Sequence, residues 1–235
     1  MVTALREAIK KASDPQKATF AARFFKTGVG EYGEGDVFCG ITVPSSRKIA
    51  VTFKDLPFQD ITKLLQSKVH EERLIALLIL VDQYERGNEQ TKEKIYAFYL
   101  AHTKYINNWD LVDLSADKIV GEYLKSHDRS ILRRLAHSSN IWERRISIVS
   151  TYQLIKDLKE YKDTFVVADI LLHDIHDLIQ KAVGWMLREV GKRVSEKIEE
   201  DFLKSRYQKM PRTALRYAIE RFPEEKRKKY LTGEI

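Results

Sequence analysis

The spacing of the apolar residues is helical along almost the whole chain, and this spacing limits the fold more than any other feature. Apolar side chains recur three or four residues apart, which is the period of an α-helix, and no segment alternates as a convincing strand does. Five prolines and ten glycines among 235 residues leave few interruptions. The sequence therefore predicts an all-α protein.

The predicted helices are short, and brief connections join them. No long seam of heptads is present, which argues against a coiled coil or a simple four-helix bundle and favours stacked helix pairs. The predicted helices cover residues 3–12, 15–26, 44–53, 57–67, 70–86, 89–101, 108–124, 128–137, 140–155, 163–172, 176–192, 195–208, 211–221 and 223–231.

Three residues stand out from the pattern of their helices, and their spacing suggests a repeat. Trp109, Arg145 and Trp185 follow one another at intervals of 36 and 40 residues, each in the second half of a helix pair. This interval suits a HEAT-like repeat of about 40 residues, in which equivalent positions line one concave surface. No proline-rich or low-complexity linker divides the chain, so we expect one domain over residues 1–235.

Composition excludes several classes of protein. Hydrophobic residues make up 43% and charged residues 32%, and the longest apolar run, Leu74 to Val81, is too short to span a bilayer. The first 14 residues lack the apolar core and cleavage site of a secretory signal. Because Cys39 is the single cysteine, no internal disulfide can form, and we expect a cytoplasmic protein without a membrane segment.

The positive charge gathers near the C-terminal end. The formal net charge is +7, and residues 188–229 hold 14 Lys and Arg against 8 Asp and Glu, a surplus of 6. Basic surfaces attract polyanions, nucleic acid above all, through phosphate contacts and counterion release. Lysine-rich helix faces can also serve solubility alone, so charge by itself leaves both interpretations open.

An acid lies in the apolar stripe of the predicted helix 109–124. Asp113 is four residues from Trp109 and three from Ala116, whereas Asp110 and Asp117 are expected toward the edge of the stripe, within reach of water. An unpaired carboxylate in a packing face costs about 2 to 7 kcal/mol. Asp113 is therefore either part of a buried ion pair or cap, or a functional group.

Arg145 and Trp185 break the pattern in opposite ways. Arg145 projects within the apolar stripe of its helix and needs an anion, which is either a structural partner such as Asp113 or a phosphate. Trp185 falls off the apolar stripe, between Lys181 and Arg188 on a basic face. Its indole is expected either to contact nucleic acid or to pack against the next helix pair.

A glycine motif and a histidine pair resemble a nucleotide site and a metal site, but their contexts argue against both functions. Gly28, Gly30 and Gly33 match the GxGxxG pattern, but they follow an amphipathic helix and lie in an acidic segment, so we expect a loop that glycine permits and no nucleotide site. His173 and His176 lack a third ligand, and we expect Asp174 and Asp177 to cap the helix that follows. The sequence predicts no metal site.

Several segments together resemble the AlkD-type family of bacterial DNA alkylation-repair glycosylases. These segments are NWDLVD at 108–113, NIWERR at 140–145, IQKAVGWMLRE at 179–189 and the glycine-rich stretch at 26–47, and the resemblance runs from about residue 15 to 220. It implies a right-handed superhelix of HEAT-like repeats, an α-solenoid with a concave face that holds duplex DNA. It also implies hydrolysis of the N-glycosidic bond of cationic alkylated purines, such as 3-methyladenine and 7-methylguanine, with the lesion left in the duplex.

The resemblance implies a role for each unusual residue. Asp113 would be the catalytic carboxylate, Trp109 and Trp185 would contact the deoxyribose of the lesion, and Arg145 would hold a backbone phosphate. Lys181, Arg188 and Phe24 would be further DNA contacts. The expected protein is a monomeric, monofunctional glycosylase that acts on alkylated double-stranded DNA in base excision repair and needs no cofactor.

Two departures from the family pattern affect DNA contact. Phe24 stands where family members can have a tyrosine, and Asp177 and Leu178 stand where members can have an aromatic pair. The alternatives to a glycosylase are a non-catalytic HEAT-like scaffold that binds nucleic acid or protein, and an adaptor without DNA affinity. Salt-sensitive DNA binding without base release would indicate the first alternative.

Overall fold

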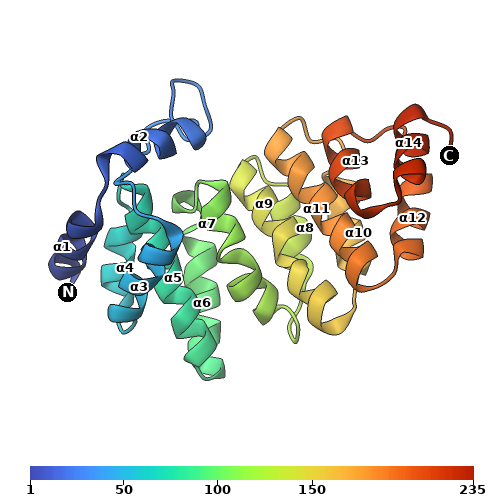
Figure 1. Cartoon of the computed structure of the whole chain (residues 1–235). Helices are drawn as coiled ribbons and strands as arrows, with labels where there is room; N and C mark the ends of the chain where they lie inside the picture. Colours follow the sequence, from blue (N-terminus) through green and yellow to red (C-terminus); the bar gives the residue numbers. More distant parts are fainter. The chain divides into compact units, whose positions relative to one another are not determined.

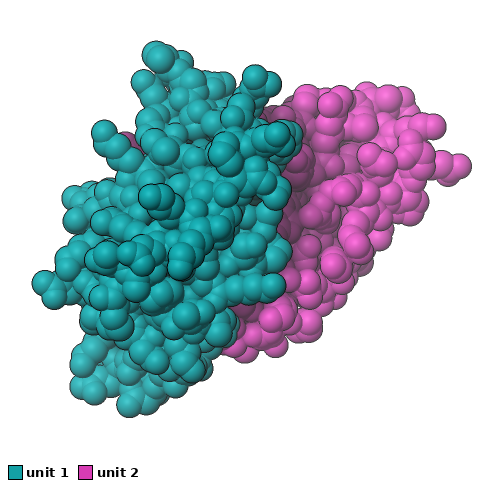
Figure 2. Space-filling view, turned by 60° about the vertical axis from the view of Figure 1, so that its left-hand side comes forward, with its two compact units in different colours: residues 1–115 teal, residues 116–235 magenta.

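The computed structural model describes all residues from Met1 to Ile235 and contains helices and loops, as the sequence predicts (Figure 1). The all-α prediction is therefore confirmed, while the handedness of the superhelix and the concave DNA face stay predictions. The chain forms two compact units, Met1–Ser115 and Ala116–Ile235 (Figure 2). The expectation of one domain over the whole chain stays a prediction as well.

Unit 1 is built around one buried helix, α5 (His70–Arg86), whose 17 residues include 13 that are buried. Its run from Leu74 to Val81 is apolar on all sides and must be covered on all sides, and helices α3, α4, α6 and α7 pack against α5. The other helices of unit 1 are α1 (Val2–Ala12), α2 (Pro15–Phe24), α3 (Val43–Thr52), α4 (Phe58–Leu65), α6 (Glu89–Ala101), the 3-10 turn η1 (Thr103–Tyr105) and α7 (Trp109–Asp113).

Unit 2 is built around α11 (Asp177–Arg193), which packs against α9, α10, α12 and α13. Its close approach to α13 depends on Gly184, where a Cβ atom would lie 2.3 Å from the carbonyl oxygen of Ala214. The remaining elements are η2 (Asp117–Gly121), α8 (Ser130–Ala136), α9 (Ile141–Ser150), η3 (Leu154–Leu158), α10 (Lys162–Ile170), α12 (Glu196–Lys204), α13 (Arg212–Ala218), η4 (Ile219–Arg221) and α14 (Glu224–Thr232).

Helix starts follow the capping residues of the sequence. Asp14 accepts hydrogen bonds from the backbone N–H groups of Gln16 and Lys17, and Pro15 takes the first position of α2, as predicted. Asn88 and Asn140 cap α6 and α9 in the same way. No helix combines the length and the apolar character needed to span a bilayer.

The predicted helix 108–124 is wrong in one respect that matters for the site. The α-helical segment ends at Asp113, a turn follows at Leu114 and Ser115, and the chain then continues through the π-helical turn η2. The predicted helix 140–155 is also interrupted, because α9 ends at Ser150 and a π-helical turn, η3, follows. An apolar stripe drawn through residues 109–124 at a constant 100° per residue therefore does not describe which side chains are buried.

The glycine-rich segment is a loop fastened to the start of α5. Val37 donates its N–H to the Lys68 carbonyl at 3.0 Å and accepts from the N–H of His70 at 2.8 Å. Gly40 has a φ of +79°, which favours glycine, and lies against the first turn of α2. This loop therefore connects α2, α5 and, through its side chains, α7.

Candidate active site

The five-residue helix α7 carries the residues of the predicted site in unit 1. The side-chain oxygen of Asn108 caps the helix by accepting from the backbone N–H of Trp109 at 2.8 Å. The amide nitrogen of the same side chain donates to Asp36 at 3.4 Å. Asn108 is fully buried, so this cap also ties α7 to the glycine-rich loop.

Trp109 lies on a surface of aromatic rings contributed by the end of α2. Its ring stacks on Phe25, with centroids 5.2 Å apart and an interplanar angle of 14°, and it meets the edge of Phe24 at 5.9 Å. Phe24 is 55% exposed and Trp109 is half-buried. The structure thus brings the rings of Phe24 and Trp109 together, and their contact with DNA stays a prediction.

Behind Trp109 the rings continue inward as a column. Phe25 stacks on Phe38 with centroids 5.0 Å apart, and Phe38 stacks on the imidazole of His70 at 4.5 Å. Three consecutive stacked pairs therefore join an accessible indole on α7 to a buried histidine on α5.

Asp110 is the buried acid of α7, and the expectation that it lies at a water-accessible edge is wrong. The residue is 5% exposed, and its carboxylate lies 2.8 Å from Nε2 of His70. The reason is the short helix: its first turn faces α5, so the second residue of α7 points inward. Asp113, one turn later, is half-buried.

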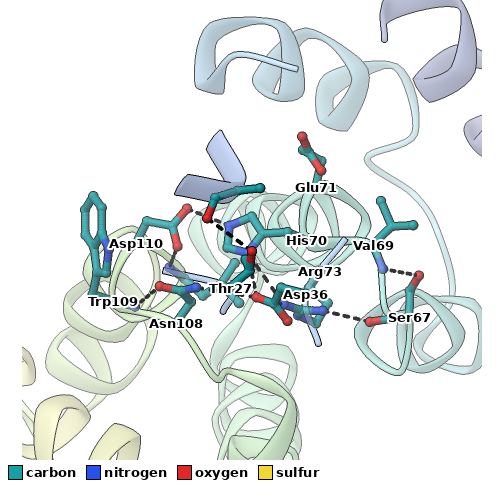
Figure 3. A network of polar contacts seen from close by, with 12 residues as sticks. Thr27, Asp36, Ser67, Val69, His70, Glu71, Arg73, Asn108, Trp109 and Asp110 are labelled. Carbon is teal, nitrogen blue, oxygen red and sulfur yellow. Dashed lines mark hydrogen bonds and ion pairs between the residues drawn. The ribbon is translucent and has the colours of Figure 1, made fainter. Parts of the chain in front are cut away.

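His70 lies between two carboxylates. Its Nδ1 faces Asp36 at 3.4 Å and its Nε2 faces Asp110, while Arg73 pairs with Asp36 at 2.7 Å and donates to the Ser67 carbonyl (Figure 3). The side chains of all four ionisable residues are at most 7% exposed. Two acids and two bases balance one another, which is what allows charges to be buried.

The pKa of His70 follows from this arrangement. Burial by itself lowers the pKa of the imidazole, but the attraction and hydrogen bond of Asp110, together with the hydrogen bond of Asp36, raise it from 6.5 to about 9. For Asp36, burial raises the pKa, and the hydrogen bond of His70 and the attraction of Arg73 outweigh it, so the pKa is lowered. His70 is therefore an imidazolium at neutral pH and donates from both nitrogens.

A cavity of about 210 Å³ lies beside this network, between α2, the glycine-rich loop and α5. Asp110 and His70 form part of its wall, and Phe20, which is 70% exposed, lies at its edge. Glu71, also in the wall, accepts hydrogen bonds from the backbone N–H groups of Cys39, Gly40 and Ile41. The polar groups of the cavity wall thus already have partners within the protein.

In unit 2, Trp185 lies on α11 beside the predicted cations. Its ring is half-buried, 6.3 Å from the ring of Tyr152. Lys181 pairs with Asp177 at 2.9 Å, and Arg188 pairs with Glu220. Both carboxylates are at least half exposed, and the cations lie on the same helix as the indole, as predicted.

Arg145 is almost completely buried. It is 5% exposed, and its Nη1 donates to the backbone carbonyl of Leu178, one residue inside the start of α11. The structure therefore anchors this guanidinium between α9 and α11. A phosphate contact by Arg145 stays a prediction.

Capping of α11 differs from the expectation. His176 itself caps the helix, with Nδ1 accepting from the N–H of Leu178 at 3.2 Å. Asp174 accepts from the N–H of His176 and pairs with Arg144 at 2.7 Å, whereas Asp177 pairs with Lys181. Asp174 and Asp177 thus stabilise the turn and the helix surface but do not cap α11.

The loop expected at Gly28, Gly30 and Gly33 is confirmed, since a helix and not a strand precedes it. Glu31 accepts from the N–H of Gly28 at 2.9 Å, and Glu34 accepts from the N–H of Gly30 at 2.8 Å. Acidic side chains of the loop thus occupy backbone donors that a phosphate would need in a dinucleotide site.

Sequence reasoning missed the side chains that support α7, namely Asp36, Phe38, His70, Arg73 and Asp110. One signal was available: the four polar residues 70–73 directly precede the longest apolar run of the chain. Acids in the first turn of a helix are common on exposed surfaces, so their complete burial could not be inferred from type and position alone.

Helices that pack against one another within each unit, with no strand, define an all-α protein of the helical-repeat class. A family model described as DNA alkylation repair enzyme matches residues 5–222, and the chain belongs to this family. Its fold is similar to that of a solved structure described as a predicted DNA alkylation repair enzyme from Enterococcus faecalis. The TM-score is 0.68 at 18% identity, covering 90% of this chain and 97% of that one. No curated protein matches the sequence.

Proposed function

We propose that the protein is a monofunctional DNA glycosylase that hydrolyses the N-glycosidic bond of cationic alkylated purines in duplex DNA. The observation that carries the proposal is the half-buried carboxylate of Asp113 at the end of α7, the helix that begins with Trp109. Membership in the DNA alkylation repair family and the net charge of +7 support DNA as the substrate.

The chemistry requires little from the protein because the leaving group is already activated. When the C1′–N bond breaks, its electron pair moves to the purine and neutralises the positive charge of the ring. The sugar becomes an oxocarbenium-like cation, and a water oxygen then bonds to C1′ while its proton is released. No separate acid is needed to protonate the base, so the lesion need not be flipped into a pocket.

Asp113 has two roles in this proposal: its negative charge stabilises the sugar cation, and its oxygen orients the attacking water. Electrostatic groups of this kind contribute about 10²- to 10³-fold to a rate. The indoles of Trp109 and Trp185 contact the deoxyribose, where their electron-rich faces also favour a developing cation. Phe24, beside Trp109, extends the apolar contact surface.

Lys181 and Arg188 are proposed to contact DNA phosphates, together with Arg145. The partners of the first two, Asp177 and Glu220, are exposed carboxylates. Exposed ion pairs contribute only about 0–1 kcal/mol, so phosphate can replace these carboxylates at little cost. The proposed enzyme acts in the cytoplasm without a cofactor. It is proposed to be a monomer of 27.4 kDa, and light scattering of the purified protein tests this oligomeric state.

The deciding experiment incubates methylated and unmethylated duplex DNA with the wild type and with Asp113→Asn, and identifies released bases by mass spectrometry. We expect 3-methyladenine and 7-methylguanine from the wild type and a loss of at least about 100-fold in rate for the variant. Asp55→Asn is the control, because its carboxylate is 73% exposed and pairs only at the surface. Release of modified base by Asp113→Asn at the rate of the wild type and of Asp55→Asn would refute the role of Asp113.

The same experiment tests the alternative of a non-catalytic scaffold. Such a protein binds duplex DNA in a salt-sensitive way and releases no base from any substrate. An adaptor that acts on proteins alone shows no DNA affinity even at low salt.

A further inference from the structure

Helix α7 is too short to be rigid by itself. Its five residues form little more than one turn, and isolated helices shorter than about 12 residues are marginal in water. The position of Trp109 and Asp113 therefore depends on what holds α7 from outside.

Polar contacts hold the first turn of α7 at two points. Asp110 is fixed by Nε2 of His70 at 2.8 Å, and its other carboxylate oxygen accepts from the backbone N–H of Leu111 at 2.9 Å. Asn108 links the cap of α7 to Asp36, which in turn faces His70 and Arg73. The result is a closed set of buried contacts between α7, α5 and the glycine-rich loop.

Aromatic contacts hold the same turn from another direction. The stacked column of Trp109, Phe25, Phe38 and His70 ends on the imidazole that also holds Asp110. Two neighbouring residues of α7 are thus connected to one side chain of α5. Asp110 contacts His70 directly, and Trp109 is connected to it through Phe25, whose ring lies 5.0 Å from the imidazole. A shift of the imidazole would disturb both connections together.

We propose that His70 and Asp110 are a positioning pair, which acts through α7 to hold Trp109 and Asp113 in the geometry required for base release. This inference rests on the proposed glycosylase function. It also assigns a purpose to the glycine-rich loop, which supplies Asp36 and Phe38 to the same set of contacts.

A purely structural ion pair would have different consequences. Removing one partner of a buried pair destabilises the fold because the other charge is left uncompensated, but it would leave the chemical step of the surviving folded molecules unchanged. A positioning pair acts on the chemical step, because a misplacement of about 1 Å at a catalytic group can cost about 100-fold in rate.

The test compares Asp110→Ala with Asp110→Asn under single-turnover conditions. The asparagine keeps an oxygen that can accept from His70, so we expect it to retain most of the wild-type rate. For Asp110→Ala we expect the rate constant of base release to fall about 10- to 100-fold, with the Kd for methylated duplex within twofold of the wild-type value.

A spectroscopic signal reports the position of Trp109 without any catalysis. The three tryptophans are replaced by 5-fluorotryptophan, and the Trp109 resonance is assigned with Trp109→Phe. We expect Asp110→Ala and His70→Gln to shift this resonance, and Asp110→Asn to shift it less. Glu72→Gln is the matched control, since Glu72 is also buried in the first turn of α5 but pairs with Arg6 of α1.

The outcomes separate this inference from the function on which it rests. If the wild type releases no base, the proposed glycosylase is refuted, while the Trp109 resonance still tests positioning. An unchanged resonance and an unchanged rate in folded Asp110→Ala would overturn the positioning pair. If Asp110→Ala does not fold, His70→Gln removes the imidazole partner of the pair and is held to the same two measurements.

Discussion

The buried imidazolium of His70 should make the stability of unit 1 depend on pH in a particular direction. The pKa of His70 is about 9 in the folded protein and 6.5 in an unfolded chain. Because the folded value is the higher one, the protonated form stabilises the fold. This contribution is complete below pH 6.5 and is lost as the pH rises toward 9.

The two pKa values give the size of the effect. Each pH unit between them corresponds to about 1.4 kcal/mol, so the loss between pH 6 and pH 9.5 is about 3 kcal/mol. The groups that face the imidazole are Asp110 from α7, Asp36 from the loop and Arg73 from the next turn of α5. Because the pKa of Asp36 is lowered, its carboxylate is ionised throughout this range, and we assign the pH dependence to His70.

Urea unfolding at several pH values measures this contribution, with the Trp109 fluorine resonance as the probe because Trp109 is the tryptophan of unit 1. We expect the wild type to lose about 3 kcal/mol more than His70→Gln between pH 6 and pH 9.5. His102→Gln is the control, since His102 also lies in unit 1 but its ring nitrogen Nδ1 donates to the Phe98 carbonyl. Equal pH dependence in the wild type and His70→Gln would refute the assigned charge state.

Three further predictions follow from other parts of the structure. Gly40→Ala should destabilise unit 1 more than Gly35→Ala in urea unfolding. Both positions have positive φ, which costs about 1–2 kcal/mol for alanine, but of the two only Gly40 would place a Cβ atom against backbone, 2.1 Å from the carbonyl oxygen of Asp14. Equal losses in the free energy of unfolding would contradict this. Burial, and then the charge of Glu196, raise the pKa of Glu199 from 4.5 to about 9, so the free energy of unfolding falls as the pH rises through that range. Glu199→Gln should therefore flatten the pH dependence of the unfolding of unit 2. An unchanged slope would show that Glu199 is ionised at neutral pH. Lys181→Ala and Arg188→Ala should each lower the salt dependence of DNA binding by about one phosphate contact, and an unchanged dependence would remove that residue from the DNA interface.

Helix positions could be predicted from the sequence because local signals determine them. Asp14 with Pro15 gave the start of α2, and the period of residues 70–86 gave α5 with the observed bounds. The interruption after Asp113 could not be predicted. A π-helical turn leaves the apolar residues of the segment in place in the sequence and changes only the direction in which the following side chains point around the helix axis.

The accessible part of the candidate site was easier to predict than its support. Trp109 and Asp113 stand out because their types conflict with the surrounding pattern, and Phe24 was named through the family resemblance. His70 and Asp110 do not conflict with it, since polar residues in the first turn of a helix are ordinary. Their burial depends on contacts between residues 40 positions apart, which periodicity cannot reveal.

The most direct test of the account is the single-turnover rate of 7-methylguanine release from a methylated duplex by the wild type and Asp113→Asn, with the Kd for that duplex measured in the same preparations. The account predicts a rate at least about 100-fold lower for the variant, with a Kd within about twofold of the wild-type value. A rate for Asp113→Asn within threefold of the wild type, at equal affinity, would contradict the assignment of Asp113 as the group that stabilises the sugar cation.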